Sequence, residues 1–112
     1  MVKGMEKLDE LVKKFNQRAM EDERLSSDIA DLKRDILLNF KDDGKFYLHL
    51  ENSRLDFVDP FENPDIEIEM DMDTFNKILS KELDALSAYI TKRIVVRASL
   101  RDKLLLSDLL KA

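Results

Sequence analysis

Three acidic residues at two-residue spacing are the side chains most able to bind a hard cation or to share acid–base work. Glu67, Glu69 and Asp71 alternate with apolar residues, and paired carboxylates serve metal binding and proton transfer. A period of two puts them on one face of a strand, with about 7 Å between neighbours. No ligand from a second direction accompanies them. We therefore expect them to face solvent and to pair with Arg93 and Arg97, not to hold a metal.

Most other enzymatic chemistry lacks its residues. The chain has no Cys and a single His, which removes thiol catalysis, thiolate and His-rich metal sites and most nucleophilic triads. Gly4 and Gly44 are the two glycines, too few for a phosphate-binding loop, and no serine has a Gly-x-Ser-x-Gly context. His49 alternates with apolar residues and is expected on the solvent side of a strand. The sequence predicts no catalytic residue, no metal and no cofactor.

The size and charge of the chain suit one acidic domain. Its 112 residues are 44% hydrophobic and 38% charged, enough to bury one core. The net charge of −5, with no run of Lys or Arg, argues against nucleic acid as a partner. No apolar run reaches the ~18 residues of a membrane span, and no signal segment precedes the charged N-terminus. We expect a cytoplasmic protein of one domain over residues 1–112, without a transmembrane segment.

Helical periodicity governs residues 1–34. Apolar residues at three- and four-residue spacing predict an amphipathic helix over residues 2–24 that covers the core. A break near Leu25 and Ser26 leads to a second short helical turn, which serine or aspartate side chains can cap. The apolar face of the long helix contains Met5, Leu8, Val12, Phe15 and Ala19.

The period changes to two from Ile36 onward. Alternating runs over residues 36–40 and 46–50 flank an Asp-Gly pair that ends at Gly44, which is a strong hairpin signal. A turn at Asn52 and Ser53 leads into a third run over residues 54–59. These runs predict a three-stranded antiparallel meander.

The second half of the chain mixes strands and helices. Residues 66–72 alternate as a fourth strand, and residues 94–98 form a fifth strand. Between them, Asp73 caps a helix that contains Phe75 and Leu83, and a second helical stretch contains Leu86 and Ile90. Ser99 caps a leucine-rich helix that runs to the end and needs cover on two sides. Together these elements predict an α+β fold, a five-stranded and mainly antiparallel sheet with helices on one face and a helix at each end.

A more specific pattern of residues runs through the second half of the chain. Asp65 precedes alternating apolar residues that end at Met70, and Phe75 follows five residues later. The run from Ala88 to Ile90 and the strand that starts at Arg93 complete the pattern. Together with the order of elements, it resembles a sterol-carrier-protein-2 domain. The resemblance covers roughly residues 35–110. It implies an apolar tunnel between sheet and helices that binds or presents lipids and fatty-acyl molecules, without catalytic residues.

Matching the family position by position gives a candidate tunnel lining. Lys81, Lys92 and Ala98 stand where the family has glycine, so we expect the backbone to change shape there, because only glycine adopts positive φ without cost. The candidate lining consists of Met70, Phe75, Leu79, Leu83, Leu86, Tyr89 and Ile90, with Leu104 and Leu105 from the last helix.

Two alternatives exist for the interior of the tunnel. An empty apolar cavity of about 300 Å³ would cost about 7 kcal/mol, on the scale of the whole stability of a small domain. A hydrophobic small molecule such as a fatty acid or an acyl lipid therefore occupies it, or side chains close it. The first alternative is a lipid carrier. The second is a protein-interaction or dimerisation domain whose tunnel is filled by side chains and which binds a partner protein or forms a homodimer.

Overall fold

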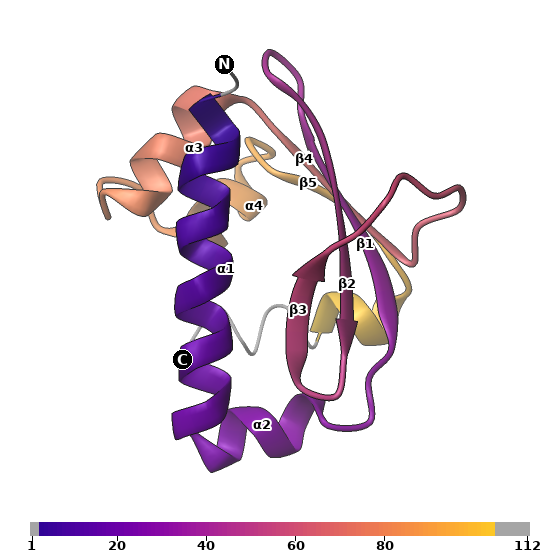
Figure 1. Ribbon diagram of the computed structural model, residues 1–112. Coiled ribbons are helices and arrows are strands. Elements are labelled where there is room, and N and C mark those ends of the chain that lie inside the picture. The colour runs from indigo at the N-terminus through magenta and orange to yellow at the C-terminus, as the bar shows by residue number, and fades with distance from the viewer. Residues whose placement is uncertain (1–2, 105–112) are drawn as a thin grey trace.

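The computed structural model describes residues 3–104, and its elements follow the predicted order. Two helices precede a meander, and a strand, two short helices and an edge strand follow it (Figure 1). A helical turn at residues 100–104 ends the described chain. The elements are α1 (Lys3–Glu21), α2 (Glu23–Ile29), β1 (Arg34–Phe40), β2 (Gly44–Glu51), β3 (Arg54–Phe57), β4 (Ile66–Met70), α3 (Met72–Leu79), α4 (Ala85–Ile90) and β5 (Val95–Arg97).

The five strands form one mixed sheet in the order β3-β2-β1-β4-β5. The β1–β2, β2–β3 and β4–β5 pairs are antiparallel, which confirms the meander and the mainly antiparallel sheet. β1 and β4 are parallel, with Ile36 opposite Ile66. The predicted α+β class is therefore confirmed, and one central pairing is parallel.

The two predicted hairpin turns have the backbone geometry that their residues favour. Asn52 and Ser53 have φ angles of 55° and 60°, the left-handed pair that a two-residue hairpin needs. Gly44 opens β2 with a φ of 144°, which a residue with a side chain adopts only with strain. The register from Phe40 opposite Gly44 to Arg34 opposite Leu50 follows.

Aspartate side chains fix where the helices begin. Asp22 has an extended backbone, and its carboxylate accepts the N–H groups of Arg24 and Leu25 at 3.0 and 3.2 Å. It therefore caps α2, and the predicted break near Leu25 and Ser26 is wrong. The break lies earlier, because an aspartate supplies the cap in place of the serines.

The start of α3 shifts for the same reason. The Asp71 carboxylate accepts the N–H of Thr74 at 2.8 Å, and the hydroxyl and N–H of Thr74 hold the pKa of Asp71 below its usual value. Asp71 is the N-cap, and Met72 is helical. The predictions that Met72 ends the fourth strand and that Asp73 caps the helix are therefore wrong.

The chain keeps left-handed backbone at two lysines. Lys81 has a φ of 66° and Lys92 a φ of 65°, in the position after a helix where glycine is the usual residue. The expectation that the backbone changes shape there is wrong for these two residues. The helix ends are held by their own hydrogen bonds, including Arg93 N–H to the Ala88 carbonyl at 2.8 Å.

The main core lies between one face of the sheet and three helices. Figure 1 shows α1, α3 and α4 on the same side of the strands. The Phe40 ring lies 5.5 Å from Phe46 and 4.9 Å from Phe75, centre to centre. A second buried cluster joins α1 and α2 to Leu50. The main cluster contains Leu8, Val12, Leu38, Phe40, Leu48, Met70, Phe75, Ala88 and Ile94.

Candidate functional site

The candidate tunnel residues divide into an inner and an outer group. Met70 and Phe75 are buried in the main core, and Leu83 packs against it. These three side chains come from β4, α3 and the α3–α4 connection, so the fold brings them together. They form the inner group, between the sheet and the helices.

The outer group lies on the surface of the helices. Leu86 is half-buried, whereas the exposed fractions are 37% for Leu79, 38% for Tyr89 and 69% for Ile90. Ala88 is the residue of α4 that faces the core, and Ile90 lies about 200° around the helix from it.

The last helix begins as predicted. The Ser99 hydroxyl accepts the N–H of Asp102 at 3.1 Å, which is the expected cap. Leu104 is 59% exposed. Leu105 and the rest of the predicted leucine-rich helix lie outside the described residues.

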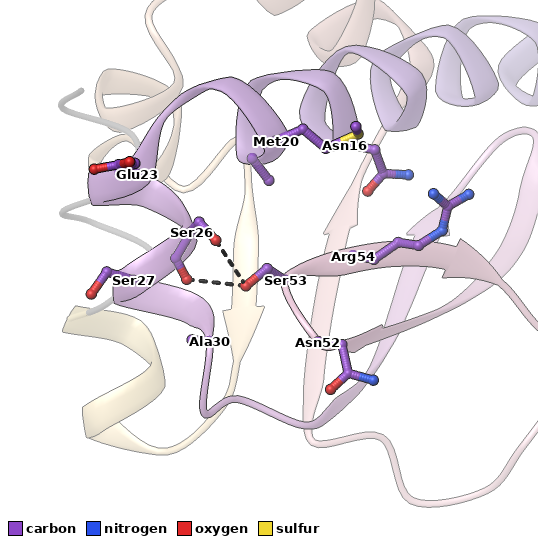
Figure 2. Close-up of a pocket in the computed structure, with 10 residues that line it drawn as sticks. Asn16, Met20, Glu23, Ser26, Ser27, Ala30, Asn52, Ser53 and Arg54 are labelled. Atoms are coloured by element: carbon purple, nitrogen blue, oxygen red, sulfur yellow. Dashed lines mark hydrogen bonds between the residues drawn. The ribbon is translucent and has the colours of Figure 1, made fainter.

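A hollow of about 560 Å³ lies elsewhere, at the elbow of α1 and α2 beside the β2–β3 turn (Figure 2). The Ser53 hydroxyl donates to the Ser26 carbonyl at 3.0 Å and joins the turn to α2. Sequence reasoning assigned these serines to capping and turn roles, and no spacing pattern links residues this far apart. The hollow is lined by Asn16, Ala19, Met20, Glu23, Ser26, Ser27, Ala30, Asn52, Ser53 and Arg54.

The edge strand β3 is closed by one side chain of α1. The Asn16 amide donates to the Leu55 carbonyl and accepts the Leu55 N–H, both at 2.8 Å. At Leu55 the amide thereby takes the place that another strand would occupy, so the backbone N–H and carbonyl of Leu55 are satisfied within the chain.

Glu67 and Glu69 form an acidic row on β4, and one of the two predicted arginines pairs with it. Arg97 Nη1 lies 2.7 Å from Glu67 and 3.5 Å from Glu69. Arg93 instead contacts Asp73 at 3.3 Å, so the prediction that Arg93 faces the acidic row is wrong. Within residues 3–104, no three metal-ligating side chains gather into a site.

His49 is held between two carboxylates on the face of the sheet opposite the core. Its ring nitrogens lie 2.8 Å from Asp35 on β1 and 2.8 Å from Glu51 on β2. The hydrogen bond to Glu51, followed by that to Asp35, raises the pKa of His49 above 6.5. His49, followed by Lys33, lowers the pKa of Glu51. The predicted face is confirmed, but the ring is half-buried and bound on both sides.

An ion pair fixes the first turn of the last helix to the start of β1. Arg34 Nε donates to Asp102 Oδ2 at 3.0 Å, and the Asp102 side chain is buried. The bond to Asp102 raises the pKa of Arg34, so the guanidinium stays charged. It joins residues 68 positions apart.

The sequence and the fold identify the family. The chain matches the profile of the SCP-2 sterol transfer family over residues 9–111. It therefore belongs to this family, a class of lipid and sterol carrier domains, and the predicted resemblance is confirmed. No curated protein matches the chain.

Solved structures of sterol carrier proteins share the fold over most of their length. A crystal structure of sterol carrier protein 2 is 18% identical, with a TM-score of 0.62, and the match covers 89% of this chain and 90% of that one. The palmitated sterol carrier protein 2-like 2 of Aedes aegypti is 13% identical, with a TM-score of 0.65 and coverage of 90% and 91%.

The fold also occurs inside a much larger enzyme. The sec-alkylsulfatase Pisa1 from Pseudomonas sp. matches with 15% identity and a TM-score of 0.58 over 77% of this chain. The chain spans only 14% of the length of that enzyme.

In the part of the chain that the structure describes, no helix has the length and hydropathy needed to cross a bilayer.

Proposed function

We propose that the chain is a cytoplasmic, single-domain carrier that binds a lipid or fatty-acyl molecule and has no catalysis of its own. The family match over residues 9–111 is the observation that carries this proposal. The likeness of the fold to a palmitated relative supports a fatty-acyl ligand.

The proposed ligand site lies where β4 meets α3 and α4. Met70, Phe75 and Leu83 supply its inner wall, because they meet in the core between the sheet and the helices. The surface residues of the helices supply its rim. The complete proposed lining is Met70, Phe75, Leu79, Leu83, Leu86, Tyr89, Ile90, Leu104 and Leu105.

Side chains have to move to admit the ligand. The Phe40 ring packs 4.9 Å from Phe75, which closes the inner wall. A site that opens only for its ligand avoids the ~7 kcal/mol of an empty cavity of about 300 Å³. Met70 and Met72 suit this role, because unbranched thioether side chains repack at low cost.

The alternative function is an interaction domain with a filled tunnel. The exposure of Leu79, Tyr89 and Ile90 favours it, because apolar residues of this size on a surface often mark a contact with a partner or with a second copy. In that case the inner wall stays closed, and no lipid is retained.

A tryptophan reporter distinguishes the two functions, because the chain contains no Trp. We expect a nitroxide-labelled fatty acid to quench the fluorescence of Phe75→Trp, whose ring replaces one on the inner wall. The matched control is Phe61→Trp, because the centre of the Phe61 ring lies 5.1 Å from that of the Tyr47 ring, on the face of the sheet opposite the core. Its fluorescence should change little.

Native mass spectrometry of the wild-type protein provides the second measurement. A one-to-one complex with an acyl lipid supports the carrier. Equal quenching of both reporters, or a dimer mass with no lipid and no quenching, contradicts the proposed site and favours the alternative.

A further inference from the structure

The connection between β3 and β4, residues 58–65, is fixed to the sheet at both of its ends (Figure 1). At its start, the Val58 N–H donates to the Tyr47 carbonyl at 3.0 Å. At its end, the Asp65 N–H donates to the Asp35 carbonyl at 2.9 Å, and the Asp65 carboxylate accepts the Asp35 N–H at 2.8 Å. Two prolines restrict the backbone between these bonds. The connection therefore presents its side chains from a preformed backbone.

This connection places an aromatic ring and an aliphatic side chain on the outer face of the sheet. The centres of the Phe61 and Tyr47 rings lie 5.1 Å apart, with the ring planes at 83°. Leu55 and Phe57 face the core, so alternation directs Val58 to the outer face, where it is 39% exposed. Both rings are half-buried. We call Tyr47, Val58 and Phe61 the connection surface.

Two acidic side chains beside the Phe61 ring are unpaired. Asp59 and Glu62 are exposed and stand on either side of Phe61 in the sequence. Among the residues that the structure describes, neither carboxylate has a hydrogen bond or an ion pair. The arginines of β3 and β5, by contrast, already bond carboxylates on the strands. The connection therefore carries free negative charge next to an exposed apolar surface.

The negative sign of this face remains after its basic residues are counted. Residues 45–69, which supply β2, β3 and β4, contain seven acidic residues and two of Lys and Arg. Asp35 adds one acid, and three bases of neighbouring segments contact these acids: Lys33, Lys41 and Arg97. The totals are then eight acids and five bases, so a second copy of this face or an anionic partner is repelled and a cationic partner is attracted.

Among cationic side chains, arginine suits this surface best. Its planar guanidinium stacks on aromatic rings and bonds carboxylates with several N–H groups, whereas the lysine ammonium is a compact and strongly hydrated charge. We propose that the connection surface docks an arginine-bearing segment of a protein partner, with a guanidinium on the Phe61 ring and bonded to Asp59 and Glu62. The inference goes beyond the proposed carrier function. Because the lipid site is proposed on the other face of the sheet, the two proposals can fail separately.

The test measures fluorescence anisotropy of a short labelled peptide of alternating arginine and serine, and of the same peptide with lysine in place of arginine. We expect the protein to bind the arginine peptide about fivefold more tightly and both peptides more weakly at high salt. Phe61→Leu removes the ring but keeps an apolar side chain. It should weaken binding of the arginine peptide about fivefold and bring the two peptides close in affinity.

The acids are tested by a pair of double variants with equal charge. Asp59→Asn with Glu62→Gln should weaken binding of the arginine peptide about tenfold, because it removes both carboxylates beside the ring. The matched control is Glu6→Gln with Glu10→Gln on α1, which changes the net charge by the same amount and should weaken binding less than about twofold. All four residues are exposed, so neither double variant alters the core.

The two tryptophan reporters separate this inference from the carrier function. Phe61→Trp should change its fluorescence on addition of the arginine peptide and not on addition of the labelled fatty acid, and Phe75→Trp should do the reverse. If Phe75→Trp responds to the fatty acid while Phe61→Trp ignores the peptide, the docking surface is overturned and the carrier stands.

Three other outcomes overturn the inference. Equal affinity of the wild-type protein for the two peptides would mean that the acidic face attracts any cation. Equal weakening by the two double variants would mean that net charge alone decides. Self-association, measured by sedimentation equilibrium and lost in Phe61→Leu, would assign the connection surface to a second copy.

Discussion

The outer face of the sheet and the helix pair α3–α4 arrange their side chains in opposite ways. On the sheet, charged groups are satisfied by one another: Arg97 bonds Glu67 at 2.7 Å, and His49 bonds two carboxylates at 2.8 Å. On the helix pair, Ile90 is 69% exposed beside a lysine in strained backbone. The contrast teaches where binding should be sought, because a surface whose groups are already paired gains little from a partner.

The largest expected effect comes from breaking the most buried of the ion pairs. Arg34→Met leaves the buried Asp102 carboxylate without its partner and should lower the free energy of unfolding by about 3 kcal/mol. Urea unfolding measures this change. The matched control is Lys33→Met, because Lys33 is exposed and lies 3.8 Å from Glu51, so that its loss should cost below about 0.5 kcal/mol. Equal costs for the two variants would contradict the assignment.

A smaller effect is expected at the edge of the sheet. Asn16→Ala removes two hydrogen bonds to Leu55 and should cost about 2 kcal/mol in the free energy of unfolding. Gln17→Ala is the neighbouring control, because its amide donates to Glu21 at 3.1 Å in an exposed pair. If Asn16→Ala were no more costly than Gln17→Ala, the closure of β3 would not depend on the amide.

The smallest effect is a pH dependence. His49 has a folded pKa above 6.5, so its stabilising contribution is complete below pH 6.5 and is lost as the pH rises through the raised pKa. Glu51 has a folded pKa below 4.5, so its contribution is present above pH 4.5 and is lost as the pH falls through the lowered pKa. The cluster of His49 and Glu51 therefore stabilises the fold most between pH 4.5 and pH 6.5.

His49→Gln tests this dependence cleanly, since the chain has a single His. The wild-type protein should lose stability as the pH rises above 6.5 through the raised pKa of His49, and the variant should lose less. The charged groups near His49 are Asp35 and Glu51, which bind its ring, and Lys33, which lies 3.8 Å from Glu51. Asp56 lies opposite His49 on β3. Urea unfolding at several pH values gives the comparison, and parallel curves for the two proteins would exclude a role for the histidine.

Local patterns predicted most of the fold. The alternation of apolar and polar residues located the strands. Gly44 and Asn52 located the turns, because their backbone preferences act over a few residues. The parallel pairing of β1 with β4 was not predicted, since it depends on packing between distant segments. The caps were misplaced where acids compete, as at Asp71 and Asp73, and local sequence does not decide between them.

The candidate site was predictable only in its inner half. Alternation directs Met70 to the core, and the apolar stripe of the following helix, which begins at Phe75, directs that ring there too. In α4, which has six residues, apolar side chains surround the helix, so spacing alone did not separate Ala88 from Ile90. The partners of His49 depended on register: Asp35 lies opposite His49 once Phe40 pairs with Gly44.

The parallel pairing of β1 with β4 also bears on the order in which the chain folds. The β1–β2–β3 meander joins neighbouring segments through short turns, so its loops close quickly and at low entropic cost. β4 has to return across some thirty positions to align Ile66 with Ile36, and β5 can add only to β4. We therefore expect the meander to form first, and the half of the sheet that positions α3 and α4 to be completed last.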